Sequence, residues 1–327
     1  MTVMTLPLPP FYEPDQASKI YVERAALVAE TAEVFRTRHG VKPASTDRFR
    51  IAAFGIDVQI GFATPGASLF VPGATEDTRR TLGWLYANAD VITGLHFSMD
   101  THRVFQIFHP SFWVDADGKH PAPFTQIAHE DVRSGRWSPV AHPKECLEYV
   151  KRLETNGKYT LTIWPFHTLL GGVSHALVPP MMEAAIFHAV LRRHQTHFET
   201  KGTHAMTENY SVLSPEVREL GGQSVGSFNA PFFEMLMTYD RVYVFGQAKS
   251  HCVLSTLNDL REHIEATDAA LLDKIWVLED ATSPVPAPAL DPLPPALDFP
   301  RVAERAFAEL ERAGMHVAKT TDPIGIP

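Results

Sequence analysis

Residues Val242–Val253 read VYVFGQAKSHCV, and this stretch decides the fold. Its first six residues, Val242–Gln247, are mostly apolar and rich in β-branched and aromatic types, as in a strand buried on both faces. A short loop follows, and Cys252 begins an amphipathic stretch that continues to Glu265. A strand that passes through a short loop into a helix is typical of α/β proteins with parallel sheets.

The same alternation of apolar runs and amphipathic stretches continues on both sides of this segment. Further candidate strands are Ile51–Asp57, Val91–Ser98, Tyr159–Ile163, His197–Lys201, Ile275–Glu279 and, less clearly, His316–Thr320. Further candidate helices are Glu76–Asn88, Met181–His194 and Arg301–Ala313. We therefore predict an α/β fold with a doubly wound, mainly parallel six-stranded sheet and helices on both faces, in a Rossmann-like three-layer arrangement.

Three segments lie outside this alternation. Residues 1–48 contain one helical pattern, about Asp15–Arg38, and are predicted to form an N-terminal helical extension. Residues 49–327 then form the main domain, with an insertion at about 113–157. Residues 281–300 include seven prolines, which favours a stiff surface connection without regular secondary structure.

Composition and charge narrow the classes of partner. The 327 residues carry 29 Lys and Arg against 38 Asp and Glu, a formal charge of −9, and no long basic run that would indicate nucleic-acid or membrane-surface binding. No apolar stretch reaches the roughly 18 residues of a membrane span, and the N-terminus lacks the pattern of a secretory signal. Two cysteines, Cys146 and Cys252, cannot form a disulfide framework. We predict a cytoplasmic protein with a small-molecule partner; a homo-oligomer is left open.

Three chemically useful side chains follow predicted strands. Asp57 ends the first strand, Lys201 ends another before a glycine, and Cys252 begins the helix after the strand of the opening segment. Ligands bind at the carboxyl ends of the strands in open α/β sheets. A thiol at a helix N-terminus is expected to have a lowered pKa, and the N–H groups there can bind an oxyanion. Taken singly, each residue also has an ordinary structural explanation.

A second group of residues indicates a metal site. Asp100 and His102 are two positions apart in an extended segment, so both side chains can reach one ion. His109 follows a short loop, and His167 lies far downstream. With 16 histidines against two cysteines, imidazole and carboxylate ligands are favoured over thiolates, and such a set suits Zn²⁺, Fe²⁺ or Mn²⁺. Any one of these histidines is more often an ordinary polar residue.

Five motifs in a fixed order carry a resemblance. They are IDVQIGF, MDTHR with HPSF, WPFH, TKGTHAMTENYS and GQAKSHCV, and each falls where a loop is predicted. In this order the chain resembles the nicotinamidase branch of the isochorismatase-like cysteine hydrolases over roughly residues 50–320. Residues 1–48 and 113–157 have no counterpart in the resemblance.

The resemblance implies an enzyme and its site residues. It implies a metal-dependent cysteine amidohydrolase that converts a small aromatic primary amide to acid plus ammonia through a thioester on Cys252. Zinc is the first choice of metal, with iron or manganese as alternatives. The implied residues are the triad Asp57, Lys201 and Cys252; the metal ligands Asp100, His102, His109 and His167; the ring-stacking pair Phe62 and Trp164; and an oxyanion hole formed by the N–H groups of Ala248 and Cys252, with a cis peptide bond before Ala248.

The chain departs from the family pattern beside the pocket, which leaves alternatives open. Thr168 stands where the family often has cysteine, and Ile60 and Gly61 replace two polar residues. In one alternative, the substrate is another small amide or a carbamoyl compound. In another, the enzyme is a metal-independent isochorismatase-like hydrolase. A metallohydrolase with a structural Cys252 and an inactive relative used for binding are the remaining classes.

Overall fold

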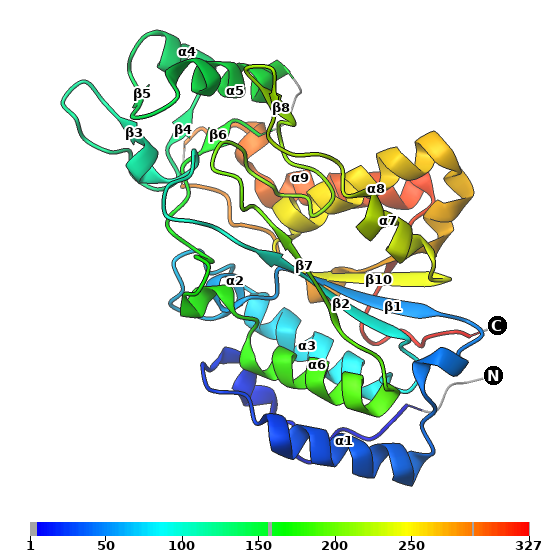
Figure 1. The fold of residues 1–327 in the computed structure, drawn as a ribbon. Coiled ribbons are helices and arrows are strands. Elements are labelled where there is room, and N and C mark those ends of the chain that lie inside the picture. The colour runs from blue at the N-terminus through cyan, green and yellow to red at the C-terminus, as the bar shows by residue number, and fades with distance from the viewer. Residues whose placement is uncertain (1–4, 156–158, 290, 327) are drawn as a thin grey trace.

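The computed structural model describes residues 5–155, 159–289 and 291–326. A six-stranded sheet in the order β12-β11-β10-β1-β2-β7 forms the centre of the molecule (Figure 1), and every neighbouring pair is parallel. Its strands are β1 Ile51–Ile56, β2 Gly94–Asp100, β7 His197–Lys201, β10 Arg241–Gly246, β11 Ile275–Leu278 and β12 His316–Ala318. The predicted parallel α/β sheet is confirmed.

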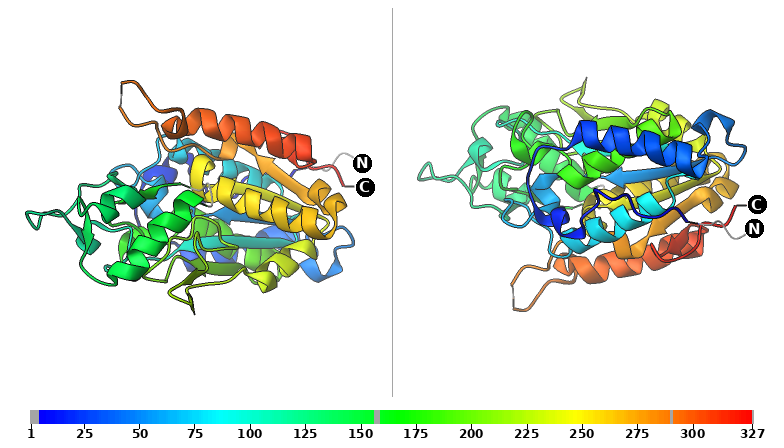
Figure 2. Two further views of the ribbon diagram at one scale, coloured as in Figure 1. Left: turned by 90° about the horizontal axis from the view of Figure 1, so that it is seen from above. Right: turned by 90° about the horizontal axis from the view of Figure 1, so that it is seen from below.

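Helices cover both faces of the sheet (Figures 1 and 2). One face carries α1 Ala25–His39, α3 Ala74–Ala87 and α6 Pro179–Arg192, and the other carries α7 Ala230–Met237, α8 Leu254–Thr267 and α9 Phe299–Ala313. Side chains of β1 alternate between the two layers, because successive residues of a strand point to opposite faces. Ala52 and Phe54 belong to one apolar core, and Ile51 and Ala53 belong to the other. Burial on both faces explains the continuous apolar runs in the sequence.

One predicted strand does not belong to the sheet. The run Tyr159–Ile163 forms only the two-residue β6, Leu161–Thr162, which pairs antiparallel with β4, Gln126–Ile127. The apolar pattern here arises because Leu161 and Ile163 are buried in the core that the insertion shares with α8. Strand β12, the weakest candidate from the sequence, occupies the sheet edge instead.

The single helix expected near the N-terminus is broken into two pieces. A 3₁₀ turn, η1 Pro14–Ser18, precedes α1, and an irregular segment separates them. The break lets the Tyr21 hydroxyl and the Arg24 guanidinium bind the buried carboxylate of Glu183 on α6, at 3.0 Å and 2.9 Å. The extension packs on the main sheet layer through this contact; the boundary at residue 48 stays a prediction, and residues 1–4 lie outside the described residues.

The insertion lies at the end of the sheet where the strands terminate (Figure 1). Its described part, residues 113–155, contains the short strands and helices β3 Trp113–Val114, β4, α4 His129–Arg133, β5 Ser138–Pro139 and α5 Pro143–Thr155. Tyr149 on α5 hydrogen-bonds to Glu208, and Phe124 packs edge-on against Trp164 at 5.9 Å. The insertion is therefore part of the wall around the carboxyl end of the sheet.

The proline-rich segment is largely irregular, as expected, but not throughout. It contains the short turns η7 Glu279–Ala281 and η8 Pro295–Leu297, and α9 already begins at Phe299; residue 290 lies outside the described part. The remaining elements are η2 Ala44–Thr46, α2 Ile60–Ala63, η3 Pro110–Phe112, η4 Val173–His175, β8 Glu219–Leu220, β9 Gln223–Ser224, η5 Lys249–Val253 and η6 Ala269–Lys274. No helix in the described ranges has the length and apolar character needed to cross a bilayer.

Candidate active site

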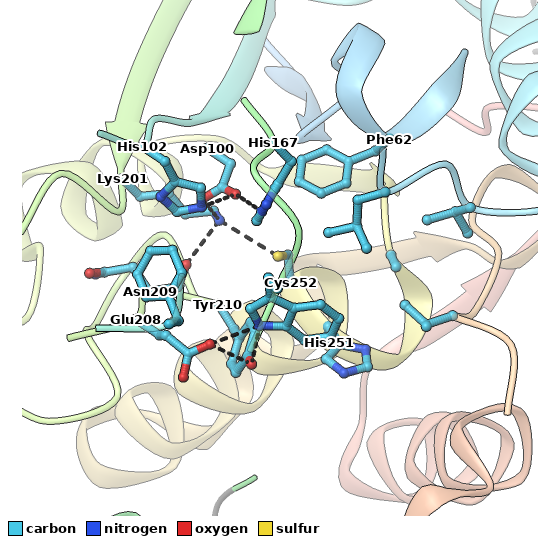
Figure 3. Close-up of a pocket in the computed structure, with 16 residues that line it drawn as sticks. Phe62, Asp100, His102, His167, Lys201, Glu208, Asn209, Tyr210, His251 and Cys252 are labelled. Carbon is cyan, nitrogen blue, oxygen red and sulfur yellow. Dashed lines mark hydrogen bonds and ion pairs between the residues drawn. The ribbon is translucent and has the colours of Figure 1, made fainter. Parts of the chain in front are cut away.

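A pocket opens at the carboxyl ends of the central strands (Figure 3). Asp100 is the last residue of β2, Lys201 is the last residue of β7, and Cys252 lies in η5 after β10; all three line the pocket. Its apolar wall consists of Phe62, Leu69, Val71, Phe108, Trp164, Tyr210, Ala248 and Val285. The topology thus brings together residues that are about 150 positions apart in the sequence.

Asp57 lies directly after β1 and is completely buried behind the pocket wall. Its backbone adopts a left-handed conformation, with φ of 49°. The Asp57 N–H donates to the Ser98 hydroxyl at 3.1 Å, and the same hydroxyl donates to Asp57 Oδ1 at 2.6 Å. Ser98, on the neighbouring strand β2, therefore fixes the direction of the carboxylate and leaves Oδ2 for Lys201.

Lys201 is the centre of a buried charge cluster. Its Nζ lies 2.8 Å from Asp57 Oδ2, 2.8 Å from Asp100 Oδ1 and 3.6 Å from Cys252 Sγ, and it donates to the carbonyl oxygen of Asn209 at 2.9 Å. The side chain is 1% exposed. One ammonium group thus contacts both carboxylates and the thiol, and it balances part of the negative charge in a place from which water is excluded.

Burial and these neighbours shift the pKa values of the cluster. Burial alone would lower the pKa of Lys201, but the carboxylates of Asp100 and Asp57 hold it well above its usual range. Burial raises the pKa of Asp57, against the opposing effect of Lys201. Burial also raises the pKa of Cys252 well above that of a free thiol, although Lys201 acts in the other direction.

The lowered thiol pKa expected from the sequence is therefore wrong for the protein without substrate. The helix-terminus argument omitted the desolvation of Cys252, which is 7% exposed, and the nearby carboxylates of Asp57 and Asp100. The resting thiol therefore keeps its proton.

The loop before Cys252 provides a free backbone donor. The peptide bond Gln247–Ala248 is cis, as the resemblance implied. Among the described residues, nothing accepts a hydrogen bond from the Ala248 N–H, and Ala248 lines the pocket with Cys252. The proline-rich segment holds the other side of this loop, because the Lys249 N–H donates to Ser283 O at 2.8 Å and the Val285 N–H donates to Ser250 Oγ at 3.0 Å.

Three of the four predicted metal ligands are grouped on the other side of Lys201. Ligand atoms of Asp100, His102 and His167 lie within 4.8 Å of one another, and all three residues are buried. His102 Nε2 is 2.8 Å and His167 Nε2 is 3.5 Å from Asp100 Oδ2. Gln59 holds this region in place, since its side-chain amide bonds both the N–H and the carbonyl oxygen of Asp100.

His109 lies beside these three residues, but it is not part of the group whose ligand atoms lie within 4.8 Å of one another. Its ring centroid is 5.9 Å from that of His102 and 6.2 Å from that of His167, with both ring pairs near perpendicular. Its buried Nε2 has no hydrogen-bond partner in the described part of the chain. Burial, together with His167 and His102, lowers the pKa of His109 to about 3, so the ring is neutral and carries a free lone pair.

The tautomers of the histidines fit a bound cation. In all three rings Nδ1 faces a backbone carbonyl oxygen: His102 that of Gly202 (3.1 Å), His109 that of Val104 (3.2 Å) and His167 that of Pro165 (2.7 Å). A carbonyl oxygen only accepts, so Nδ1 carries the proton in a neutral ring and Nε2 presents its lone pair. With both rings neutral, the lone pairs of His102 and His167 face the carboxylate oxygen Asp100 Oδ2, an arrangement that a divalent cation would stabilise.

Two of the positions that depart from the family pattern, Thr168 and Gly61, contact each other beside Asp100. Thr168 has a left-handed φ of 43° and places Oγ1 3.4 Å from Asp100 Oδ2. A Cβ atom on Gly61 would lie 3.0 Å from Thr168 Cγ2 and 3.1 Å from Ser174 O, so the close approach of α2 to this loop favours glycine. Both positions shape the wall around Asp100 and Phe62.

The predicted ring-stacking residues line the pocket from two sides. Phe62 packs edge-on against His167 at 5.5 Å, and Trp164 is tied by its Nε1 to Glu208 at 2.9 Å (Figure 3). Sequence reasoning assigned no role to Gln59 or Glu208, although both lie in the quoted motifs IDVQIGF and TKGTHAMTENYS.

Comparisons with known proteins support the fold. No protein-family model and no curated protein matches the chain. Among solved structures, a nicotinamidase/pyrazinamidase from Acinetobacter is similar with a TM-score of 0.52 and 19% identity, covering 85% of this chain and 99% of that chain. The yeast nicotinamidase bound to the inhibitor nicotinaldehyde gives a TM-score of 0.53 and 19% identity, covering 82% and 99%. The predicted isochorismatase-like, nicotinamidase-type fold is thereby confirmed.

Proposed function

We propose that this chain is a metal-assisted cysteine amidohydrolase that converts a small aromatic primary amide to the carboxylic acid and ammonia. The observation that carries the proposal is the contact of one buried ammonium group, Lys201 Nζ, with Asp57, Asp100 and the Cys252 thiol. Nucleophile, proton acceptor and balancing charge are then gathered around one ammonium group beside a mainly apolar pocket.

In the proposed reaction Cys252 is the nucleophile and Asp57 moves the proton. As Cys252 Sγ bonds to the amide carbon, its proton passes to Asp57, and the carbonyl oxygen becomes an oxyanion held by the N–H groups of Ala248 and Cys252. The protonated Asp57 then donates to the leaving nitrogen, so ammonia departs and a thioester remains. Asp57 next takes a proton from water, whose oxygen attacks the thioester. As the C–S bond breaks, Asp57 returns this proton to Cys252 Sγ, and the acid and the thiol are released.

Lys201 keeps the charge balanced during these steps. The thiol pKa is high in the resting site, so proton transfer and attack are expected to occur together rather than from a preformed thiolate. Lys201 lies 3.6 Å from the sulfur and stabilises the negative charge that develops there. Its second carboxylate partner, Asp100, keeps the ammonium protonated throughout.

Asp100, His102 and His167 would hold a divalent transition metal, zinc being our first choice, with His109 as the fourth protein ligand. When bound, the metal supplies a Lewis-acid contact for a ring nitrogen of the substrate. The residues of the chain itself orient the ring: Phe62 and Trp164 are proposed to contact its two faces. The yeast structure of this fold holds nicotinaldehyde, a pyridine ring with a carbonyl substituent, which agrees in size and polarity with such a ligand.

Ammonia release from a panel of small amides, with nicotinamide first, tests the proposal. The panel includes benzamide, which lacks the ring nitrogen, an aliphatic amide and a carbamoyl compound. Nicotinamide turnover that is lost in Cys252→Ala supports the thioester route. Turnover that persists in Cys252→Ala would instead indicate a metallohydrolase, and the absence of ammonia from the whole panel would contradict the proposed function.

A further inference from the structure

Glu208 is a buried carboxyl group that the proposed reaction does not use. It is 4% exposed and lines the same pocket as Cys252, yet its carboxyl group points toward Tyr210 and away from Lys201, His102 and His167 (Figure 3). A carboxyl group is seldom fully buried without partners that satisfy it. The hydrogen-bond partners of Glu208 therefore indicate its structural role.

The carboxyl group of Glu208 connects three separate segments of the chain. Oε1 accepts hydrogen bonds from Trp164 Nε1 at 2.9 Å and from the Tyr210 hydroxyl at 2.8 Å, and Oε2 accepts from the Tyr149 hydroxyl at 3.3 Å. The Glu208 N–H in turn donates to the Tyr149 hydroxyl at 3.1 Å. Trp164 and Tyr210 are pocket walls, whereas Tyr149 belongs to helix α5 of the insertion.

These contacts fix the orientation of the aromatic wall. Because the indole N–H and the phenol O–H are both bound to Glu208, neither ring can rotate without losing a buried hydrogen bond. Phe124, also from the insertion, packs edge-on against the same indole at 5.9 Å. The insertion thus contacts Trp164 directly through Phe124 and indirectly through Tyr149 and Glu208.

We propose that Glu208 is a positioning residue for substrate, which holds the Trp164 and Tyr210 rings in the pocket wall and is itself held by Tyr149 of the inserted helix. The inference rests on the proposed function for its substrate. It assigns the insertion a place in substrate selection, because α5 determines where the aromatic wall lies. The described part of the insertion, residues 113–155, then supports the wall of the binding site and is not only a surface addition.

Four variants test the positioning role by steady-state kinetics with nicotinamide. Glu208→Leu keeps the approximate volume and removes every acceptor, and we expect KM to rise about tenfold with kcat changed less than about threefold. Glu208→Gln keeps an acceptor for Trp164 and should return KM to within about threefold of wild type. Tyr149→Phe removes only the distal hydroxyl and should raise KM about threefold. Lys151→Gln, at an exposed position on the same helix, is the matched control and should leave KM unchanged.

A measurement that needs no turnover accompanies the kinetics. The indole ¹⁵N–¹H resonance of Trp164, identified with Trp164→Phe, should shift in Glu208→Leu and in Tyr149→Phe but not in Lys151→Gln. An unshifted resonance in both variants, or an unchanged KM in both, would overturn the positioning role. If wild type releases no ammonia from any amide, the proposed function is wrong, whereas the resonance still decides whether Glu208 and Tyr149 fix the indole.

Discussion

Replacing Lys201 by methionine removes the only ammonium group from the buried cluster while keeping a side chain of similar length. In wild type Nζ lies 2.8 Å from Asp57, 2.8 Å from Asp100 and 3.6 Å from Cys252 Sγ. At an effective dielectric constant of about 20, a full charge on sulfur at 3.6 Å is stabilised by about 4.6 kcal/mol. This corresponds to about three pKa units.

The variant should therefore lose activity and stability in different amounts. Since the developing charge on Cys252 is no longer balanced, kcat/KM for ammonia release should fall about 10³-fold. Asp57 and Asp100 would be left as a buried carboxylate pair, so the free energy of unfolding should fall by about 3–5 kcal/mol at pH 8. The loss should be smaller at pH 5, because protonation of Asp57, whose pKa is already raised, relieves the repulsion.

The pH dependence of iodoacetamide alkylation at Cys252 measures the electrostatic effect directly. The midpoint should move upward by about three units in Lys201→Met. Lys249→Met is the matched control: it removes a lysine three residues from Cys252 whose ammonium lies over the Phe307 ring, 4.4 Å from its centroid. An alkylation midpoint that moves by less than one unit, or a fall in kcat/KM of less than tenfold, would refute the role given to Lys201.

Further predictions concern the thiol, the metal and pH. Cys252→Ser should abolish turnover. Burial raises the pKa of both thiols, but Cys252 lines the pocket whereas Cys146 is completely buried, so iodoacetamide should label Cys252 faster; mass spectrometry compares the two sites, and equal labelling would count against an accessible nucleophile. Elemental analysis should find one divalent metal per chain in wild type and none in Asp100→Ala/His102→Ala; a metal-free wild type whose activity ignores added Zn²⁺, Fe²⁺ or Mn²⁺ would favour the metal-independent alternative. Burial raises the pKa of Glu208 to about 8. Between about pH 4.5 and about pH 8 the native protein therefore keeps a proton that the unfolded protein has lost. The free energy of unfolding should fall across this range as pH rises, by up to about 1.4 kcal/mol per pH unit. Denaturant titrations should show a flatter pH profile for Glu208→Gln, and an unaltered slope would contradict the raised pKa.

The sequence predicted the sheet well because its strands are buried on both faces. Such strands give continuous apolar runs that do not depend on their neighbours, as in β1 and β10. Tyr159–Ile163 has the same pattern for a different reason: its side chains pack against the insertion, and a local apolar run cannot distinguish these two environments. The broken N-terminal helix was missed because its cause, the buried Glu183, is about 160 residues away.

The grouping of Asp57, Lys201 and Cys252 was predictable, whereas their energetics were not. The order of motifs places each residue after a strand, and parallel strands end at one edge. The direction of the thiol pKa shift depends on how completely Cys252 is buried and on the distances to Asp57 and Asp100, which no local pattern contains. His109 shows the same limit, since its spacing from His102 predicts a ligand but does not fix the position of its Nε2.

The hydrogen bonds from the Cys252 loop to Ser283 and Val285 also constrain when the site can form during synthesis. The ribosome adds residue 252 about thirty residues before it adds residue 285. When Cys252 has been synthesised, the Ser283 carbonyl oxygen and the Val285 N–H that hold its loop are therefore not yet present. Strands β11 and β12 emerge later than the loop as well. The nucleophile is therefore assembled only after nearly the whole polypeptide has been translated, and amide-hydrogen exchange at Lys249 would follow detachment of the segment that braces it.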